Sequence, residues 1–459
     1  MNTKKRNLRW DTMRILAGGF LGTIFLGAFL LWLPICNNEP ITFLDSLFTS
    51  TTAVCVTGLV TIVPATQFTL LGKVILLLLI QIGGLGIIAC TTGFFILIKK
   101  KITISERVII SETYSSDGPG GMVKMVRRAV LGTFFVEAVG AAVYACYFIP
   151  HYGVINGIGY SVFHSISAFC NAGIDILGST SFAEFVHNPL ININTMLLII
   201  LGGIGFIVWF DIVDNGKRIR KHEVPKKWWF TRLNLHSKIA LTTTAIMLVA
   251  GTLAILFFEY NNPETMGKFS VGDKIMSAAF QSVTTRTAGY FTLPQNVLHN
   301  ETKLFGAIWM FIGGSPGGTA GGIKTTTIAM LVLTAIAVIR GGEDTECFGR
   351  KISKSNFRTG FAVSLLAMII YLVGTMAIVM IESDSVPVID IIYETASASG
   401  TVGLTANLTP NLQKTSQIVL IGMMYLGRIG PLTFALVFGG RRHAASQIRE
   451  LPERNILVG

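Results

Sequence analysis

Each quarter of the chain repeats one order of segments: a long apolar run, a short amphipathic run, a small polar stretch with a glycine, and a second long apolar run. The eight long runs are 15–34, 68–98, 129–150, 190–213, 239–260, 304–339, 357–381 and 416–438. Each reaches the roughly 20 residues that a helix needs to cross about 30 Å of hydrocarbon. The four short runs, 42–53, 159–168, 271–283 and 386–398, do not. We therefore expect eight spanning helices and four re-entrant helices.

The polar stretches recur at a nearly fixed distance. Their glycines, Gly58, Gly173, Gly289 and Gly403, are separated by 115, 116 and 114 residues, which is typical of an internal repeat. Non-helical backbone at membrane depth is tolerated only inside protein or beside a water-filled cavity. We predict an all-α membrane protein in which four pseudo-fourfold repeats surround one central pore, each repeat being a helix, a re-entrant pore helix with filter, and a second helix. The predicted repeats are 1–110, 111–230, 231–345 and 346–440, and a tail follows at 441–459.

Composition agrees with a membrane protein. Hydrophobic residues make up 51% of the chain and charged residues 14%, and the mean hydropathy is +0.61, which excludes an ordinary soluble domain. The net charge of +12 does not indicate nucleic-acid binding, because the basic residues are not gathered on one soluble face. The six cysteines show no CxxC pairing, so we expect neither a disulfide framework nor a zinc site.

Lysine and arginine gather in five polar segments. Residues 1–14, 99–128, 215–238, 340–358 and the tail from 441 hold 29 of the 37. The connections on the opposite side carry fewer cations and more acidic residues. By the positive-inside rule, both termini face the cytoplasm and the glycine stretches open outward.

The glycine stretches can supply the oxygen atoms that replace the hydration shell of a cation in a pore. Glycine adopts positive φ without strain and lets four backbones approach one axis. A single stretch of this kind more often serves helix packing, but four of them at one period, each after a short helix, favour a filter. The expected selectivity filter is formed by the backbone carbonyls of Val56, Thr57, Gly58, Asn171, Ala172, Gly173, Thr287, Ala288, Gly289, Thr401, Val402 and Gly403.

The third stretch differs from the others. The position three residues before the glycine is Cys55, Cys170, Arg286 and Gly400 in turn. We expect Arg286 to brace the filter by bonding backbone carbonyls or a carboxylate, without facing the ions.

The second long run of the third quarter is interrupted. Six glycines and a proline lie between residues 313 and 322, and no helix continues through such a stretch. We therefore expect two half-helices, 304–312 and 323–339, joined by an intramembrane loop. A phosphate-binding loop requires lysine directly after glycine, but Ile323 separates Gly322 from Lys324, so nucleotide binding is not expected here.

These stretches resemble the Trk/Ktr/HKT superfamily of potassium transporters, and within it the KtrB-type membrane subunits of bacterial Ktr systems. The resemblance covers essentially the whole chain and rests on residues 53–59, 168–173, 282–289, 313–325 and 400–405. In HKT relatives a serine at the first filter glycine goes with sodium preference. Because this chain has Gly58 there, the resemblance implies transport of K⁺, and it leaves sodium dependence open.

The resemblance also implies a gate below the filter. Its residues are Gly313, Gly314, Ser315, Pro316, Gly317, Gly318, Thr319, Ala320, Gly321, Gly322, Lys324 and Arg428. A charge inside a spanning run is costly and is by default functional or paired. The resemblance makes Arg428 a positive barrier in the conduction path that also holds the loop, and the alternative is a structural ion pair with Glu137 or Asp211.

Partners and location are further implications of the resemblance. It implies a homodimer in the cell membrane of a bacterium, docked on a cytosolic ring of KtrA-like, RCK-type nucleotide-binding subunits, with residues 452–459 as the dimer contact. The nucleotide is then bound by the partner, and this chain needs no cofactor beyond the transported K⁺.

Two other functions are considered. An intramembrane enzyme needs a paired nucleophile and base, and the apolar runs carry no such recurring set, since His164 stands alone and is expected to be a satisfied polar group. We therefore expect no enzyme. A carrier for another small cation, such as Na⁺ or ammonium, is the alternative to K⁺ transport.

Overall fold

The computed structural model describes residues 2–86, 89–90, 92, 121–223, 225–382, 386–431 and 433. The basic connection at 99–120 and the tail at 441–459, with its expected dimer contact, lie outside the described residues. Most of the described chain is helical. The strands that the structure describes form a hairpin of β1 (Glu346–Cys347) and β2 (Arg350–Lys351), which the apolar pattern did not predict because both strands are only two residues long.

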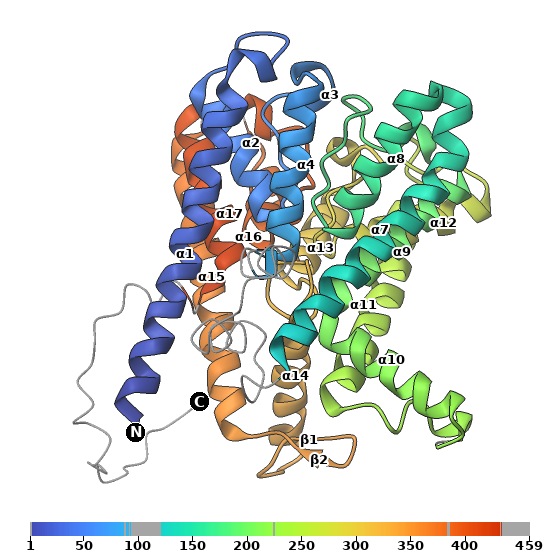
Figure 1. Cartoon of the computed structure of the whole chain (residues 1–459), viewed down its shortest axis with the longest axis vertical. Coiled ribbons are helices and arrows are strands. Elements are labelled where there is room, and N and C mark those ends of the chain that lie inside the picture. The colour runs from blue at the N-terminus through green and yellow to red at the C-terminus, as the bar shows by residue number, and fades with distance from the viewer. Residues whose placement is uncertain are drawn as a thin grey trace.

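Each quarter contains a long helix, a short helix and a second apolar helix (Figure 1). The first holds α1 (Asn2–Trp32), α2 (Phe43–Cys55), α3 (Pro64–Gln67) and α4 (Leu70–Leu85). The second holds α7 (Met122–Tyr152), α8 (Val154–Phe169), α9 (Pro189–Ile204) and α10 (Phe206–Arg220). The third holds α11 (Leu235–Glu259), α12 (Val271–Thr284), α13 (Asn300–Phe311) and α14 (Thr325–Ile339). The fourth holds α15 (Lys354–Ile381), α16 (Val388–Gly400) and α17 (Lys414–Ile429).

Short 3₁₀ turns lie in the connections between these helices. They are η1 (Pro34–Cys36), η2 (Ala183–Phe185), η3 (Lys226–Trp228), η4 (Gln295–Val297) and η5 (Thr409–Asn411). The four short helices α2, α8, α12 and α16 confirm the expected short runs. The start of α8 differs: it lies at Val154 rather than at residue 159, because Gly153, with φ of 78°, ends α7 and turns the chain directly into the next helix.

Helix length and hydropathy identify a multi-pass membrane protein. Among the described residues, α7, α11, α15 and the part of α1 from Arg14 to Trp32 are long and apolar enough to cross a membrane, and the bent pair α9–α10 is a fifth candidate. α4 and α14 are shorter apolar helices. Large apolar side chains point outward from the long helices, with Phe257 and Met380 each 81% exposed, which is typical of contact with lipid. The predicted total of eight spans stays a prediction.

The run 190–213 is not one straight helix. α9 ends at Ile204, Gly205 has a φ of 96°, and α10 continues at an angle of 97° to α9. The apolar pattern runs through this break without interruption, so hydropathy predicted one apolar run, and the structure divides that run into two helices. Only a glycine adopts this φ without strain.

The four quarters contact one another in chain order, and the fourth contacts the first. α4 packs on α8, α9 on α12, α13 on α16, and α17 on α2. In Figure 1 the blue helices of the first quarter accordingly lie beside the orange and red helices of the fourth. Residues that are more than 400 positions apart in the sequence are therefore neighbours, as in the bond from the Tyr425 hydroxyl to the Ala17 carbonyl at 2.9 Å.

Each of the first three short helices is bonded to the long helix before it in the same way. The hydroxyls of Ser50, Ser165 and Ser282 donate to the carbonyls of Ile24, Glu137 and Leu248 at 2.7, 2.6 and 2.9 Å. Three residues beyond each carbonyl the long helix has a glycine, and these are Gly27, Gly140 and Gly251. A Cβ at Gly140 would lie 2.6 Å from the Ser165 Oγ, so the close approach requires glycine.

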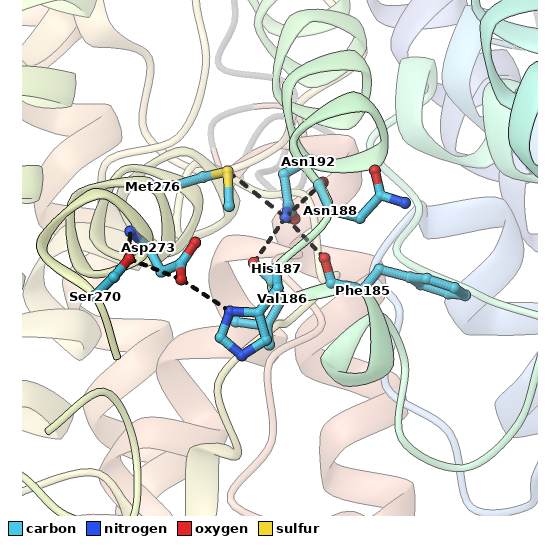
Figure 2. A network of polar contacts seen from close by, with 8 residues as sticks. All are labelled: Phe185, Val186, His187, Asn188, Asn192, Ser270, Asp273 and Met276. Atoms are coloured by element: carbon cyan, nitrogen blue, oxygen red, sulfur yellow. Dashed lines mark hydrogen bonds and ion pairs between the residues drawn. The ribbon is translucent and has the colours of Figure 1, made fainter. Parts of the chain in front are cut away.

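The N-terminal end of α12 is fixed to the second quarter by a polar network (Figure 2). The His187 Nδ1 lies 3.1 Å from an oxygen of Asp273 in the first turn of α12, and the Ser270 hydroxyl donates to the same oxygen at 2.9 Å. The Asn192 amide donates to three carbonyls of the loop before α9 and lies 3.9 Å from the Met276 sulfur. This network sets where α12 begins and hence where the stretch after it lies.

The glycine contact in α7 gives a stability prediction. Gly140→Ala places a methyl group against Ser165 and Leu198, and we expect it to destabilise the protein by about 1–3 kcal/mol through overpacking. Gly132→Ala on the same helix is the control, because its Cβ meets nothing closer than 3.5 Å and alanine favours the helix. Thermal unfolding in detergent measures both. An equal melting temperature for the two variants would contradict the packing argument.

Candidate functional site

The four glycine stretches meet at one place in the structure. A carbonyl oxygen of the residue before each glycine lies beside the glycine of a neighbouring stretch. The pairs are Ala172 with Gly58, Ala288 with Gly173, Val402 with Gly289, and Thr57 with Gly403. A Cβ built on Gly58 would lie 2.7 Å from the Ala172 oxygen and 3.2 Å from the Gly403 Cα, so no larger residue fits there without a shift. We call this arrangement the glycine ring.

The carbonyls of the glycine ring are free for another ligand. Among the described residues, no backbone or side-chain group donates a hydrogen bond to the carbonyls of Thr57, Ala172, Ala288 or Val402. A buried carbonyl without a donor costs free energy unless an ion or water pairs with it. Four such oxygens that converge on one place can therefore coordinate a cation.

The backbone of each stretch is turned by a residue with positive φ two positions before the glycine. These residues are Val56 at 56°, Asn171 at 61°, Thr287 at 64° and Thr401 at 53°. Non-glycine residues in this region cost about 1–3 kcal/mol each, and β-branched valine and threonine are rare there. The strain at the same position in all four stretches shows that the surrounding protein holds this backbone against its own preference.

A hydroxyl on each short helix holds the stretch that follows it. In the first and fourth stretches, the hydroxyls of Thr52 and Ser397 accept the N–H of Gly58 and Gly403, both at 2.9 Å. In the second and third, the hydroxyls of Ser167 and Thr284 donate to the carbonyl of the residue after the glycine, at 2.7 and 2.5 Å. These four residues were not among the predicted site residues, although each is a hydroxyl five or six positions before a glycine, which the sequence shows.

Arg286 does not bond the partners expected for it. It is 4% exposed, and its guanidinium donates to the Thr244 hydroxyl of α11 at 3.3 Å. No carbonyl or carboxylate partner of its side chain is found among the described residues, so that prediction was wrong. The side chain points to α11 rather than into the glycine ring, and its own backbone carbonyl accepts the Asn171 amide at 3.4 Å.

The interrupted helix is present as expected, with α13 and α14 separated by residues 312–324. The two limbs of this loop pair with each other, since the Gly313 N–H donates to the Ile323 carbonyl at 2.9 Å and the Ser315 and Thr325 hydroxyls lie 2.8 Å apart. These bonds hold the two limbs of the loop together.

The loop lies against the residues that precede the glycines of the second and fourth stretches. The Thr319 hydroxyl is 3.1 Å from the Phe169 carbonyl and from the Asn171 side-chain oxygen, and Gly321 abuts the Thr401 side chain. The other side of the loop is bonded to the broken helix α9: Ser315 and Thr319 donate their N–H groups to Gly203 and Gly202 at 2.8 and 3.1 Å. The loop therefore occupies the space next to the residues that turn the strained backbone.

Both cations of the candidate gate bond carbonyl groups. The Lys324 ammonium donates to the Ala320 and Gly321 carbonyls at 2.8 and 3.3 Å, within its own loop. The Arg428 guanidinium donates to the Thr319 carbonyl and to the Gly83 carbonyl of α4. Arg428 thus ties the loop to the first quarter from the end of α17.

The alternative of an ion pair for Arg428 was wrong. The Glu137 carboxylate accepts the Gln81 amide at 3.1 Å, and Asp211 accepts the backbone and side-chain N–H groups of Asn234 at 2.8 and 2.9 Å. Neither carboxylate bonds Arg428. The expectation for His164 is confirmed, because its Nδ1 lies 2.7 Å from the Tyr160 carbonyl and its Nε2 lies 3.5 Å from the Ile176 N–H.

Buried polar bonds that sequence reasoning missed join the third and fourth quarters. Lys303 of α13 pairs with Asp390 of α16 at 2.7 Å. The side chains of Gln281 and Gln295 bond each other at 2.6 Å, and the Tyr393 hydroxyl donates to Gln295 at 2.7 Å. These bonds fix the short helices α12 and α16 relative to each other, and their isolated positions in the sequence gave no signal of it.

Comparisons with known proteins agree in pointing to cation transport. The family model described as "TrkH: Cation transport protein" matches residues 9–442. The chain is 36% identical to the Ktr system potassium uptake protein B of Bacillus subtilis, over 98% of each chain, and 35% identical to the potassium/sodium uptake protein NtpJ of Enterococcus hirae, over 99% of each. The crystal structure of the potassium transporter TrkH from Vibrio parahaemolyticus matches the fold with a TM-score of 0.72 at 16% identity, covering 94% of this chain and 85% of that one.

The hydroxyl bonds give a test of the glycine ring. Ser397→Ala leaves the buried N–H of Gly403 without an acceptor, and we expect it to cost about 1–3 kcal/mol of stability. Ser399→Ala on the same helix is the control, because the Ser399 hydroxyl donates only to the Ala396 carbonyl one turn back, at 3.3 Å. The difference in melting temperature between the two variants measures the effect. Equal melting temperatures would show that the Ser397 bond does not hold the stretch.

Proposed function

Since the chain belongs to the TrkH/Ktr family of cation transport proteins, we propose that it is the potassium-translocating membrane subunit of a K⁺ uptake system. The observation that carries the proposal is the glycine ring, in which four carbonyl oxygens without hydrogen-bond donors meet beside four glycines. Rings of backbone carbonyls are the ligands that K⁺ pores use in place of water. The family and its relatives are ion transporters, so the chain is not an enzyme.

In this proposal the four stretches form one selectivity filter along a central pore. The proposed filter residues are Val56, Thr57, Gly58, Asn171, Ala172, Gly173, Thr287, Ala288, Gly289, Thr401, Val402 and Gly403. The short helices α2, α8, α12 and α16 are its re-entrant pore helices, and their C-terminal ends, which carry partial negative charge, point toward the cation path. The cyclic contacts among the quarters support four repeats, 1–110, 111–230, 231–345 and 346–440, with eight spans.

The loop 313–322 acts in the proposal as the gate, with Lys324 and Arg428. Its position against the inner ends of two stretches supports this role, because a cation leaving the glycine ring on that side meets the loop. The guanidinium of Arg428 holds the loop to α4 through Thr319 and Gly83 and adds a positive charge beside the path. Opening then requires these bonds to break, together with the backbone bonds of the loop to Gly202 and Gly203 of α9.

Location and partners follow from the family and remain part of the proposal. The protein would lie in the plasma membrane of a bacterium with both termini in the cytoplasm. The names of its relatives describe a Ktr system, which supports work with further subunits. We propose a homodimer that docks on a KtrA-like, RCK-type nucleotide-binding ring. The second candidate cargo is Na⁺, because one relative is named a potassium/sodium uptake protein.

The proposed filter predicts that a change at Gly58 alters ion selectivity. Gly58→Ser puts a side chain where a Cβ lies 2.7 Å from the Ala172 oxygen, on a backbone with φ of 106°. We expect K⁺ uptake in a potassium-transport-deficient strain to lose apparent affinity or to be inhibited by Na⁺ by at least about tenfold, which equals roughly 1.4 kcal/mol. Gly178→Ser is the control, because nothing lies within 4 Å of its Cβ. Unchanged selectivity in Gly58→Ser would rule out the filter assignment.

The proposed gate predicts that loss of the Arg428 bonds increases ion flux. Arg428→Gln removes charge-assisted bonds that are worth about 1.5–3 kcal/mol each, so we expect rubidium flux per molecule in vesicles to rise by at least about tenfold. A variant that lacks residues 316–318 should also conduct faster. Arg358→Gln, an exposed arginine of α15, should leave flux unchanged. If neither Arg428→Gln nor the deletion conducts faster than the parent protein, the loop is not the gate.

A further inference from the structure

The break in α9 creates a side arm that leaves the helix bundle. α9 is 16 residues long, or about 24 Å of helix, and at Gly205 the chain turns by 97° into α10. In Figure 1, α10 runs away from the bundle toward the end of the molecule where β1 and β2 lie. α9 alone is shorter than a full span, and the turn at Gly205 directs α10 across the axis of α9. We call residues 206–223 and 225–234 the elbow.

The elbow is folded as one unit. Asp211 of α10 accepts two hydrogen bonds from Asn234, which precedes α11, at 2.8 and 2.9 Å. The Asn215 amide donates to the Trp229 carbonyl at 2.8 Å, which ties α10 to η3. A force on any part of the elbow is therefore transmitted to the start of α10.

Positive charge and tryptophan gather on the outer part of the elbow. Its exposed cations are Lys217, Arg218, Arg220, Lys221, Lys226, Lys227 and Arg232. The exposed acids nearby are Asp214 and Glu223, and of the seven cations only Lys217 forms an ion pair with a described residue, Asp214. Trp228 and Trp229 are 47% and 38% exposed. Tryptophan beside lysine and arginine is the composition of segments that lie in the headgroup layer of a membrane.

The base of the elbow is bonded to the loop 312–324. The N–H of Phe206, the first residue of α10, donates to the Gly317 carbonyl at 3.0 Å. Gly205 lies so close to the Pro316 carbonyl that a Cβ there would be 2.5 Å from its oxygen. The Ile207 side chain lies next to Gly317 on the same side. A rotation of α10 about Gly205 would therefore pull directly on the middle of the loop.

We propose that the elbow is a binding site for anionic phospholipid headgroups and that lipid bound there sets the position of the loop 312–324. Charge complementarity selects the occupant: several unpaired cations and two exposed tryptophans on a segment directed across the axis of α9 fit a phosphate-bearing, lipid-anchored surface. The hydrogen bond from the Phe206 N–H to the Gly317 carbonyl transmits a movement of α10 to the loop. The regulatory half rests on the proposed gate, whereas the binding half does not depend on it.

The binding arm of the test uses energy transfer from tryptophan to dansyl-labelled phosphatidylglycerol, with dansyl-labelled phosphatidylcholine as the neutral probe, on the full-length protein. The variant R220Q/K226Q/K227Q removes three elbow cations. We expect it to lose affinity for phosphatidylglycerol by about fivefold for each cation removed, because a lysine or arginine near an anionic surface contributes about that factor. Affinity for phosphatidylcholine should not change.

Two matched variants separate a site from a general charge effect. R350Q/K354Q/R358Q removes three exposed cations that lie near the hairpin and at the start of α15, outside the elbow, and it should bind like the parent. R220K/K226R/K227R keeps the charges and should also bind like the parent. If both glutamine variants lose affinity equally, or if neither does, the elbow is not a specific lipid site. Displacement of the labelled lipid by millimolar inorganic phosphate or by an acidic protein would likewise overturn a lipid-headgroup site.

The flux arm tests the link to the loop. Rubidium flux is measured in phosphatidylcholine vesicles with and without phosphatidylglycerol. The parent and R350Q/K354Q/R358Q should change flux severalfold when phosphatidylglycerol is added, and R220Q/K226Q/K227Q should not. If phosphatidylglycerol changes the flux of all three proteins equally, the link between the elbow and the loop is overturned, even where R220Q/K226Q/K227Q has lost lipid binding. If no variant transports rubidium in any lipid, the proposed function fails, and the binding arm still decides the site.

Discussion

The interaction on which the rest of the structure depends is the bond between each short helix and the stretch that follows it. The hydroxyls of Thr52, Ser167, Thr284 and Ser397 fix the backbone on its outer side. This leaves a carbonyl of each stretch with no donor among the described residues, beside a neighbouring glycine. The strain at the four positive-φ residues opposes this arrangement, and packing of the short helices on the long ones must overcome it.

The four quarters share this arrangement, and in three of them the second apolar helix ends at a glycine with positive φ: Gly86 at 83°, Gly205 at 96° and Gly430 at 92°. The third quarter breaks its second apolar helix into α13 and α14, and the loop between them reaches the second and fourth stretches. The second quarter breaks its own second helix at Gly205, and that break receives the loop. In the proposed function, selectivity is shared by all quarters, while gating is assigned to the loop 313–322, Lys324 and Arg428.

The sequence predicted what depends on periodicity and missed what depends on contacts between distant segments. Length and hydropathy predicted the short helices, and the glycines at 313–322 predicted the broken one, because such breaks follow from local backbone preference. Gly202, Gly203 and Gly205 suggested a kink in the second run of the second quarter, but the size of the bend was not predictable, because it depends on the contact of Gly205 with Pro316 from another part of the chain. The resemblance implied the contact of Arg428 with the loop, which the structure has at Thr319. The bonds of Arg286 to Thr244 and of Arg428 to Gly83 were beyond prediction, because Thr244 and Gly83 come from other parts of the chain.

Anomalous X-ray diffraction from crystals of the protein grown in rubidium or thallium salts tests the central claim most directly. The account predicts anomalous density inside the glycine ring, within coordinating distance of the carbonyl oxygens of Thr57, Ala172, Ala288 and Val402. The density should weaken when K⁺ replaces the heavier ion and should persist when Na⁺ is added. A glycine ring without anomalous density, in crystals that show the ion elsewhere on the protein, would contradict the assignment of these carbonyls as the K⁺ ligands.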